Sequence, residues 1–411
     1  MMLKRICILL LIAIALRAET SVFSVAGPGD LYSSHSFYHG MAVKDTLRAN
    51  PVNYAAWAGI SNAYFNLSFD YVQHDVTANN GSSSGYDDIA ISGFSFALPF
   101  ADKHFFGLNL SPYSIVNVQN TIEKTPISGA EQLYYTGMEK RNGSFNSLSL
   151  IYGRTINNLS MAADLSCIFG NINESILQSF GNEEPSATSS FSVNKIVENN
   201  YQTGAFVFNP GISALYCWPE FSAAAKISIP LYNRFELTNS LLKNKYNTSG
   251  VVTEEETIDG CEWPLSMGAG LAWNPDRWQL SGDLLYTAFS DAKLGLAINE
   301  NYADYWKISA SARYHHSSRL LAPYYEKMTY KAGFSIEQRP EKCNNSVIND
   351  YTLFGSIITP FAGNRASVET NFSYTLAGDK SANGFEDKIW RIGFTFHNSN
   401  SWWLRKTRYD E

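Results

Sequence analysis

Residues 327–337 read KMTYKAGFSIE, and this stretch decides the fold. Its even-numbered positions are apolar or small, and its odd-numbered positions are polar apart from one glycine. Side chains of a β-strand alternate between two faces, so a period of two predicts a strand between an apolar and a polar environment. Residues 306–314 and 390–396 repeat the pattern, which recurs from about Phe65 to Phe396. The chain is therefore predicted to be all-β, as a soluble sandwich or a membrane barrel.

Strand length and aromatic placement favour the membrane barrel. Most of the alternating stretches fit the roughly 9 to 11 residues that a tilted strand needs to cross a bilayer, whereas soluble strands usually have about 5 or 6. Aromatic residues make up 14% of the chain. Tryptophan and tyrosine gather near the predicted strand ends, where amphipathic rings meet lipid headgroups.

The N-terminus predicts export. Lys4 and Arg5 precede an apolar run over residues 6–16, and residues 16–18 offer a small-residue cleavage site, so we expect a signal peptide over residues 1–18. The apolar run is too short to cross a bilayer as a helix, and no later segment has about 18 consecutive apolar residues. A secreted soluble β-protein is the alternative.

The connections predict a transmembrane antiparallel β-barrel of about 14 strands over residues 61–396, with a plug over residues 19–60 and a tail over residues 397–411. Short and long connections alternate, and in bacterial outer-membrane barrels the short ones face the periplasm. The strand count is even, with both termini periplasmic, if residues 131–155 form one long, bulged strand. We therefore expect an integral protein of the bacterial outer membrane.

The segment before the first strand is too rich in apolar side chains for a disordered linker. The wall of a barrel of this size does not fill its own lumen, so we expect the segment to act as a plug, or hatch. Two interpretations of its apolar residues stay open: a pocket for a hydrophobic ligand, or ordinary packing against the wall. The residues concerned are Phe23, Leu31, Phe37, Tyr38 and Met41.

The polar faces of the predicted strands carry charges of both signs. In an open pore such groups tune ion selectivity, and in a plugged barrel they pair with each other or with charges of the plug. These predicted lumen charges are Asp70, Asp164, Lys226, Asp283, Lys307, Arg313, Lys331, Glu369 and Arg391.

Other chemistry finds little support. A formal net charge of -7 without a basic patch excludes a nucleic-acid partner. The chain has no Gly-x-Ser-x-Gly elbow and no phosphate loop, and its histidines have no convincing ligand spacing, so we expect no enzyme, no metal and no cofactor. Cys261 and Cys343 are the one pair whose disulfide stays an open alternative to four free thiols.

Two short motifs carry a resemblance to a known family. GMAV at residues 40–43 is followed by Asn50-Pro51, and GLNLSPYS lies at residues 107–114 in the predicted third strand. With these motifs the chain resembles the FadL-type outer-membrane transporters of long-chain fatty acids and hydrocarbons, and the related PorV-like barrels. The family's Asn-Pro-Ala reads Asn50-Pro51-Val52 here. In this resemblance Gly40, Asn50 and Pro51 mark the plug.

The resemblance implies passive uptake of fatty-acid-like or hydrocarbon molecules through a plugged barrel, with a sideways exit into the membrane at the third strand. Pro112 and Tyr113 would form this lateral gate, because proline cannot donate to a strand ladder, and a plain bulge is the alternative. Two further functions stay open. One is a PorV-like scaffold that docks secreted proteins through loops near 174–202 and 236–260, and the other is a structural barrel without cargo.

The expected partners follow from these hypotheses. They are outer-membrane lipids, hydrophobic small molecules, the barrel-assembly machinery and, in the scaffold hypothesis, secreted proteins. The barrel-assembly machinery would act on the final strand, which we expect to end at Phe396.

Overall fold

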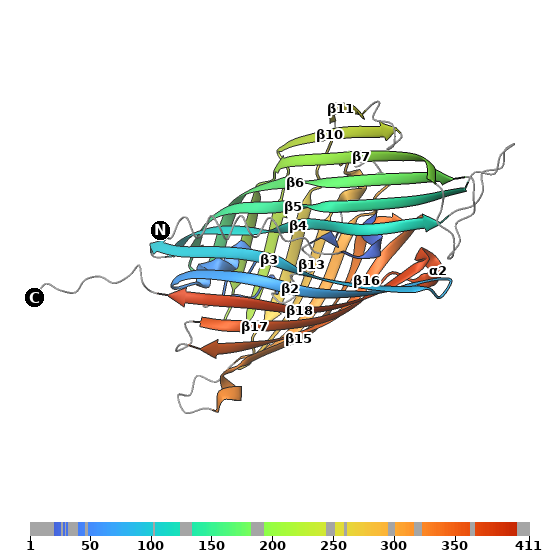
Figure 1. The fold of residues 1–411 in the computed structure, drawn as a ribbon. Helices are drawn as coiled ribbons and strands as arrows, with labels where there is room; N and C mark the ends of the chain where they lie inside the picture. Colours follow the sequence, from blue (N-terminus) through green and yellow to red (C-terminus); the bar gives the residue numbers. More distant parts are fainter. Residues whose placement is uncertain are drawn as a thin grey trace, which may run out of the picture.

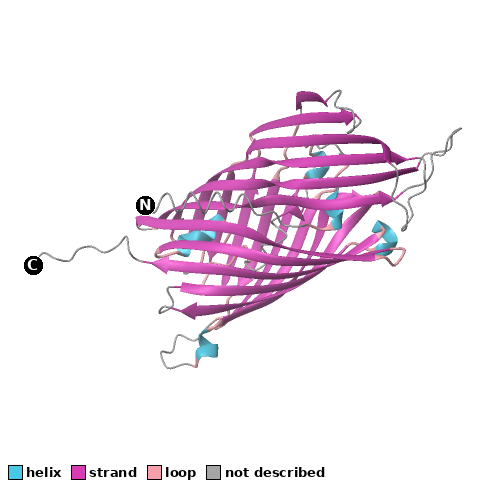
Figure 2. Cartoon of the chain, viewed as in Figure 1, coloured by secondary structure: helices cyan, strands magenta, loops and turns pink. Residues whose placement is uncertain are grey.

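One antiparallel sheet closes on itself around a lumen (Figures 1 and 2). The structure is a computed structural model. It describes residues 20–25, 28, 30–31, 40–45, 48–101, 103–123, 134–181, 193–243, 251–258, 261–294, 301–315, 323–361 and 366–400. Phe37 and Tyr38, the expected signal peptide and most of the expected tail lie outside these residues.

Long strands make up the wall, and short helices lie at its ends and in its lumen. The strands are β1 (Asp30–Leu31), β2 (Ala63–Ala78), β3 (Ser83–Ala101), β4 (His104–Glu123), β5 (Tyr134–Ile156), β6 (Leu159–Gly181), β7 (Val193–Phe208), β8 (Gly211–Cys217), β9 (Phe221–Ser228), β10 (Tyr232–Lys243), β11 (Val251–Ile258), β12 (Ser266–Trp273), β13 (Trp278–Thr287), β14 (Tyr305–Tyr314), β15 (Thr329–Cys343), β16 (Ser346–Phe361), β17 (Ala366–Ala377) and β18 (Phe385–Asn400). The helices are η1 (Val22–Val25), η3 (Tyr54–Gly59), η4 (Phe289–Asp291), η5 (Tyr324–Lys327) and α2 (Lys380–Asn383).

Three pairs of consecutive strands share one position each in the wall. Both β7 and β8 pair with β6 and share one position. On their other side β7 pairs with β10 and β8 pairs with β9, so β9 and β10 share the next position. In the same way β11 pairs with β10 and β12 pairs with β9, so β11 and β12 share the third. Pro210 and Pro230 lie at the first two interruptions, because proline has no N–H for the ladder. The strands of the described wall therefore occupy fourteen positions, and β18 pairs with β2 to close the barrel. The predicted fold class and strand count are confirmed.

The strands are longer than the sequence predicted. β5 and β6 have 23 residues each, which makes them about 75 Å long. Even at a tilt of about 45° they extend past an apolar band about 25 Å tall. On the outer face of β6, exposed Met161 and Leu165 give way to Asn171 and Asn173. Much of what was expected as external loop over 174–202 is therefore strand, and the expected strand over 131–155 is the single strand β5.

We call the end where β2 begins and β18 ends the proximal end, and the opposite end the distal end. The short connections between β3 and β4, β5 and β6, and β8 and β9 all lie at the proximal end. Among the described helices, none is long and apolar enough to cross a membrane.

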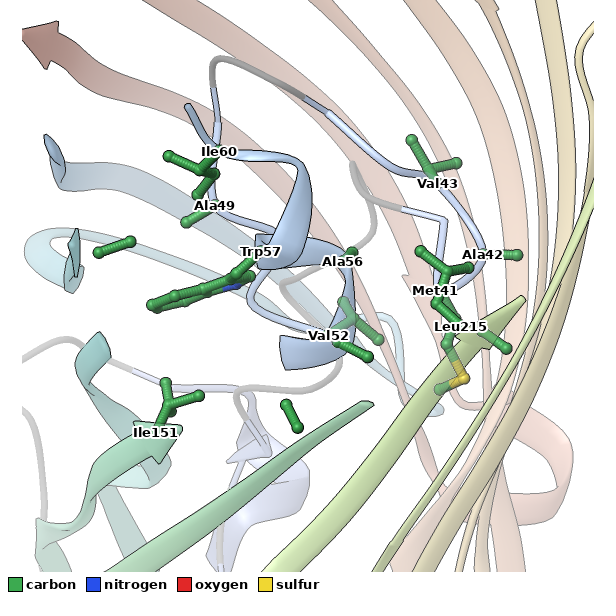
Figure 3. Packing of buried hydrophobic residues seen from close by; sticks show 14 of the residues in the cluster. Met41, Ala42, Val43, Ala49, Val52, Ala56, Trp57, Ile60, Ile151 and Leu215 are labelled. Atoms are coloured by element: carbon green, nitrogen blue, oxygen red, sulfur yellow. The ribbon is translucent and has the colours of Figure 1, made fainter. Parts of the chain in front are cut away.

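Residues 40–45 and 48–60 of the N-terminal segment pack against the inner face of the proximal half. Trp57 of η3 is completely buried and belongs to one apolar group with Leu215 of the wall (Figure 3). Phe105 of β4 is buried in the same group. The Trp57 indole Nε1 donates a hydrogen bond of 2.7 Å to the carbonyl oxygen of Asn50. A Cβ on Gly107 would lie 2.5 Å from the Trp57 ring, so only glycine fits at this position of β4. We call this group the proximal cluster; it also contains Met41, Val52, Ile151 and Ala272.

Trp57→Ala should destabilise the folded protein by about 3–5 kcal/mol, because it leaves a large cavity in a fully packed cluster. The measurement is the free energy of unfolding from urea titration of the protein in detergent micelles. Trp218→Ala, at a half-exposed tryptophan of a proximal turn, is the matched control and should change it by less than about 1 kcal/mol. Equal effects of the two variants would contradict the packing described for η3.

The last strand ends at Asn400, four residues beyond the predicted boundary at Phe396. These residues complete the closing ladder, in which Ser399 pairs with Tyr64 and Asn400 with Ala63. The His397 ring lies 2.7 Å from the hydroxyl of Tyr64.

Deletion of residues 401–411 should leave barrel assembly intact, whereas deletion of residues 397–411 should impair it, because only the longer deletion removes part of the closing ladder. The readout is the fraction of protein that migrates as a compact, heat-modifiable band after membrane extraction. Similar fractions for both truncations would place the closing residues elsewhere.

Candidate ligand cavity and lateral seam

β4 carries a bulge at the predicted gate. Pro112 is opposite Asn146 of β5 and Ser114 is opposite Phe145, so Tyr113 is an extra residue on β4. The Tyr113 ring packs against Trp263, with 5.0 Å between the ring centroids. The bulge thus places an aromatic side chain against the lumen cluster that contains Trp263.

The ladder between β3 and β4 stops just before this bulge. The two strands pair from Ala101 and His104 up to Phe94 and Leu110, and the described residues show no further register between them. Each strand nevertheless stays paired with its other neighbour almost to its distal end, and the two ribbons separate towards that end in Figure 1. We call this interruption, between residues 83–93 of β3 and 111–123 of β4, the seam.

A piece of the N-terminal segment lies on the β4 side of the seam. The two residues of β1 pair antiparallel with β4, Asp30 opposite Ile115 and Leu31 opposite Ser114. Further along, Asn117 accepts a hydrogen bond at its carbonyl from the backbone N–H of Thr20. Part of the β4 edge that β3 leaves is therefore satisfied by the chain's own N-terminal segment.

A cavity of about 180 Å³ lies behind Pro112 and Tyr113. On one side it meets the proximal cluster through Val52. On the other it meets a second apolar group, the distal cluster, through Leu31 and Ile168. The distal cluster also contains Val116, Phe145, Phe235, Trp263, Phe289 and Tyr305.

Between the two apolar clusters the cavity wall is polar. The Tyr54 hydroxyl donates to Ser149 Oγ at 3.2 Å, and Ser149 Oγ lies 2.7 Å from Ser166 Oγ. Ser166 in turn donates to the Asp164 carboxylate at 2.5 Å. The side-chain amide of Asn109 lies 3.3 Å from the Tyr54 hydroxyl. Burial raises the pKa of Tyr54 above its usual range, so the phenol stays neutral and keeps donating.

Asp164 and Lys226, both predicted as lumen charges, line this cavity. Lys226 of β9 is in register with Ala162 of β6 across β8 and with Leu285 of β13 across β12, and each of these lies two residues from one of the carboxylates Asp164 and Asp283. Asp283 also accepts a hydrogen bond of 2.7 Å from the backbone N–H of Met41. The structure thus brings three predicted lumen charges together around one region of the lumen.

The remaining predicted lumen charges lie among buried groups of opposite sign. Arg313 contacts Asp45 of the N-terminal segment at 2.7 Å, and Lys307 lies 3.5 Å from Glu337. Lys331 contacts Glu369 at 2.8 Å. Asp70 lies in the electrostatic field of Arg391 on the neighbouring strand.

The residues predicted to line a ligand pocket are not brought together. Phe23 packs in a small distal group with Ile348 and Ile389, Leu31 belongs to the distal cluster, and Met41 belongs to the proximal cluster. Of these three, only Leu31 lines the cavity.

The predicted plug residues do meet. The Asn50 side chain donates to the carbonyl oxygens of Gly40 at 2.9 Å and Val43 at 3.1 Å, and it accepts from the N–H of Val52. Pro51 lies next to this turn and lines the cavity. Asn50 therefore ties the GMAV turn to the start of η3.

The sequence reasoning missed the buried polar groups that hold the first residues of the segment. Arg339 of β15 contacts Asp30 and also Asp350, the latter at 2.8 Å. Ser21 donates to Asp387 at 2.7 Å, and His74 lies 2.9 Å from the same carboxylate. Arg339 lies in a segment expected to be an external loop, 338–349, and His74, Asp350 and Asp387 lie one or two residues outside expected loops, so no lumen face was assigned to them.

Asp30→Ala should loosen β1, because it removes one partner of a buried ion pair, a change that typically costs about 3–5 kcal/mol. In a background without the native cysteines, the rate of maleimide labelling at Ser24→Cys, a fully buried position, should rise by at least about tenfold.

Lys380→Ala is the control, because the Lys380 to Glu386 pair is half-exposed and contributes at most about 1 kcal/mol. An unchanged labelling rate in the Asp30 variant would contradict the anchoring of β1 by Arg339.

Other chemistry is limited in the described part of the chain. It holds no group of three or more His, Cys, Asp or Glu side chains placed to bind a metal ion. Cys261 and Cys343 form no disulfide there, and neither do Cys167 and Cys217.

Several solved structures share this fold. A FadL homologue of Pseudomonas aeruginosa has a TM-score of 0.58 and 13% identity, over 93% of this chain and 99% of that one. The toluene transporter TodX of Pseudomonas putida has a TM-score of 0.56 and 13% identity, over 92% and 99%. A second TodX structure has a TM-score of 0.55 and 15% identity, over 93% and 100%. No curated protein sequence matches the chain significantly.

The closed barrel and these likenesses define a FadL-like outer-membrane barrel, as the sequence motifs predicted. Within that class the chain belongs to the BamG family, whose model it matches over residues 1–410.

Proposed function

We propose that the protein is a passive outer-membrane transporter of hydrophobic small molecules, which leave the lumen sideways through the seam. The observation that carries the proposal is the interruption of the β3 and β4 ladder beside a cavity. The similar solved structures are described as a FadL homologue and a toluene transporter, which agrees with this cargo class.

The seam begins at the level of the apolar belt. On the outer face of β3, Phe100 and Ile89 are exposed, and Phe94, the last β3 residue paired with β4, lies between them. Lipid therefore covers the β3 side where the opening starts. A molecule that leaves the cavity there enters hydrocarbon and avoids water, which favours a hydrophobic cargo.

We place the proximal end in the periplasm, because the short turns β3–β4, β5–β6 and β8–β9 lie there and the long connections β4–β5, β6–β7 and β13–β14 lie at the distal end. The short turn between β15 and β16 is a distal exception, and the long connection between β14 and β15 is a proximal one. The end of β18 then lies on the periplasmic side, as expected from the sequence. The first described residues, Thr20 and Ser21, lie instead at the distal end, beside Asn117 and Asp387. The N-terminal segment of residues 19–60 is the plug in this proposal, running from the distal network around Asp30 to the proximal cluster around Trp57.

The test locks β1 onto β4. Leu31 and Ser114 are register partners, so the double variant Leu31→Cys and Ser114→Cys, made with the four native cysteines replaced by serine, should form a disulfide. Under oxidising conditions, uptake of radiolabelled toluene and 1-decanol by cells that express this variant should fall at least about tenfold. Dithiothreitol should restore it.

The control lock joins two wall strands away from the seam, through Ser281→Cys and Ser311→Cys, which are also register partners. It should leave uptake unchanged under both conditions. Uptake that persists in the oxidised seam lock would overturn the lateral route, and a wild-type protein that takes up neither probe would overturn transport itself.

A second candidate function is a docking scaffold. The regions proposed for docking, near 174–202 and 236–260, largely form the paired strands β6, β7, β10 and β11 beyond the apolar belt. Such a wall extension offers a fixed surface to secreted proteins, or to the barrel-assembly machinery that the family name suggests. Affinity capture from membranes, with and without the distal parts of β10 and β11, tests it. Loss of defined partners from the shortened protein is the expected result.

A further inference from the structure

We propose that the cavity recognises the head of an uncharged amphiphile that carries hydroxyl groups, and that it rejects carboxylates. This inference rests on the proposed transport function and names the class of its cargo.

The first argument is the chemistry of the wall. A pocket for a pure hydrocarbon needs apolar walls, yet the middle of this cavity is lined by hydroxyl, amide and charged groups, among them Asn109, Ser149 and Ser213. The chain of hydrogen bonds from Asn109 through Tyr54 to Asp164 fixes several of these groups in place. A fixed set of donors and acceptors favours a ligand that bears polar groups of its own.

The second argument is charge. Lys226 is the cation of the cavity, and a carboxylate ligand would have to approach it. Asp164 lines the same cavity, and Asp164 and Asp283 each lie two residues from the register position of Lys226, on the second strand to either side. An added carboxylate would therefore meet like charge at short range, in a region screened little by water. A neutral head meets no such repulsion.

The third argument is the balance of donors and acceptors. Within the described residues, the side-chain oxygen of Asn209, which lines the cavity and is over nine-tenths buried, has no hydrogen-bond donor. Asp164 is an acceptor as well, and Ser166 supplies one donor to it. A hydroxyl donates to such acceptors, whereas a carboxylate has no proton to donate.

The fourth argument is size and direction. The cavity, at about 180 Å³, is somewhat larger than an engineered cavity of about 150 Å³ that binds benzene. It has room for a compact head and the start of a tail. Leu31 and Pro112 lie on the side of the cavity that meets the seam, so a tail that extends there reaches the apolar opening.

The experiment is equilibrium dialysis of the full-length protein in amphipol with four radiolabelled probes that share a six-carbon chain. They are hexyl β-glucoside, 1-hexanol, hexanoate and hexyltrimethylammonium. We expect hexyl glucoside to bind at least about tenfold more tightly than hexanoate at neutral pH. Asp164→Asn removes one of the two carboxylates at almost constant shape, and it should reduce this preference at least about threefold by improving hexanoate binding.

Two further variants separate the local effect from a general one. Ser149→Ala removes a hydroxyl of the cavity and should weaken glucoside binding about fivefold, whereas Thr352→Val removes a buried hydroxyl elsewhere in the lumen and should not. Asp291→Asn, at an exposed position of η4, is the control for the charge change. The compact heat-modifiable band confirms the fold of each variant.

Each outcome decides the inference. Hexanoate or hexyltrimethylammonium bound as tightly as the glucoside would overturn it, as would a cavity that binds no probe and holds only water. An unchanged preference in Asp164→Asn would overturn the charge argument on which the rejection of carboxylates rests. Because binding is measured without transport, these results stay separate from the uptake assay, in which failure of transport leaves the binding preference intact.

Discussion

In the hydrocarbon of a bilayer an unpaired backbone N–H or C=O costs several kcal/mol. Each strand that crosses the bilayer must therefore form hydrogen bonds with a neighbour on both sides. The closing ladder between β18 and β2 is complete along both strands for this reason. The ladder between β3 and β4 departs from this pattern, because it stops at Leu110. Two residues of β1 satisfy part of the exposed edge of β4. The same backbone constraint therefore links the state of the seam to the position of the N-terminal segment.

A wall of fourteen strand positions encloses more space than its own side chains fill. In this chain the N-terminal segment occupies part of that space. Buried ion pairs occur at both ends of the lumen, where Arg339 holds Asp30 distally and Arg313 holds Asp45 proximally. Buried pairs contribute little net stability compared with apolar packing, but breaking one is costly. They therefore fix where the N-terminal segment lies more than they strengthen the barrel. Apolar packing around Trp57 provides the stability.

The fold was largely predictable, because lipid imposes a period of two on every stretch that it touches. Met161 and Leu165 of β6 show this period, and the alternation of short and long connections gave about fourteen strands. The period fades where β6 passes into water at Asn171 and Asn173, so the sequence could not distinguish a continuing strand from a loop. For the same reason Arg339 was not assigned to the lumen. The interruption at Pro112 could be predicted from the sequence. Whether it opens the wall depends on where the ladder between β3 and β4 ends, and no local sequence pattern determines that register.

In the proposed transport, the polar cavity and the apolar exit serve different steps of one passage. A molecule without polar groups would bind to any apolar surface of the lumen, and no contact would orient it towards the seam. A head that hydrogen-bonds to the fixed network around Tyr54 and Asp164 is held in one orientation, with its tail beside Leu31. Leu31 pairs with Ser114 on the edge of β4, so a tail that displaces it also frees part of that edge. Recognition of the head and opening of the wall would then both depend on the pair of Leu31 and Ser114. Binding of the cargo would itself open the wall.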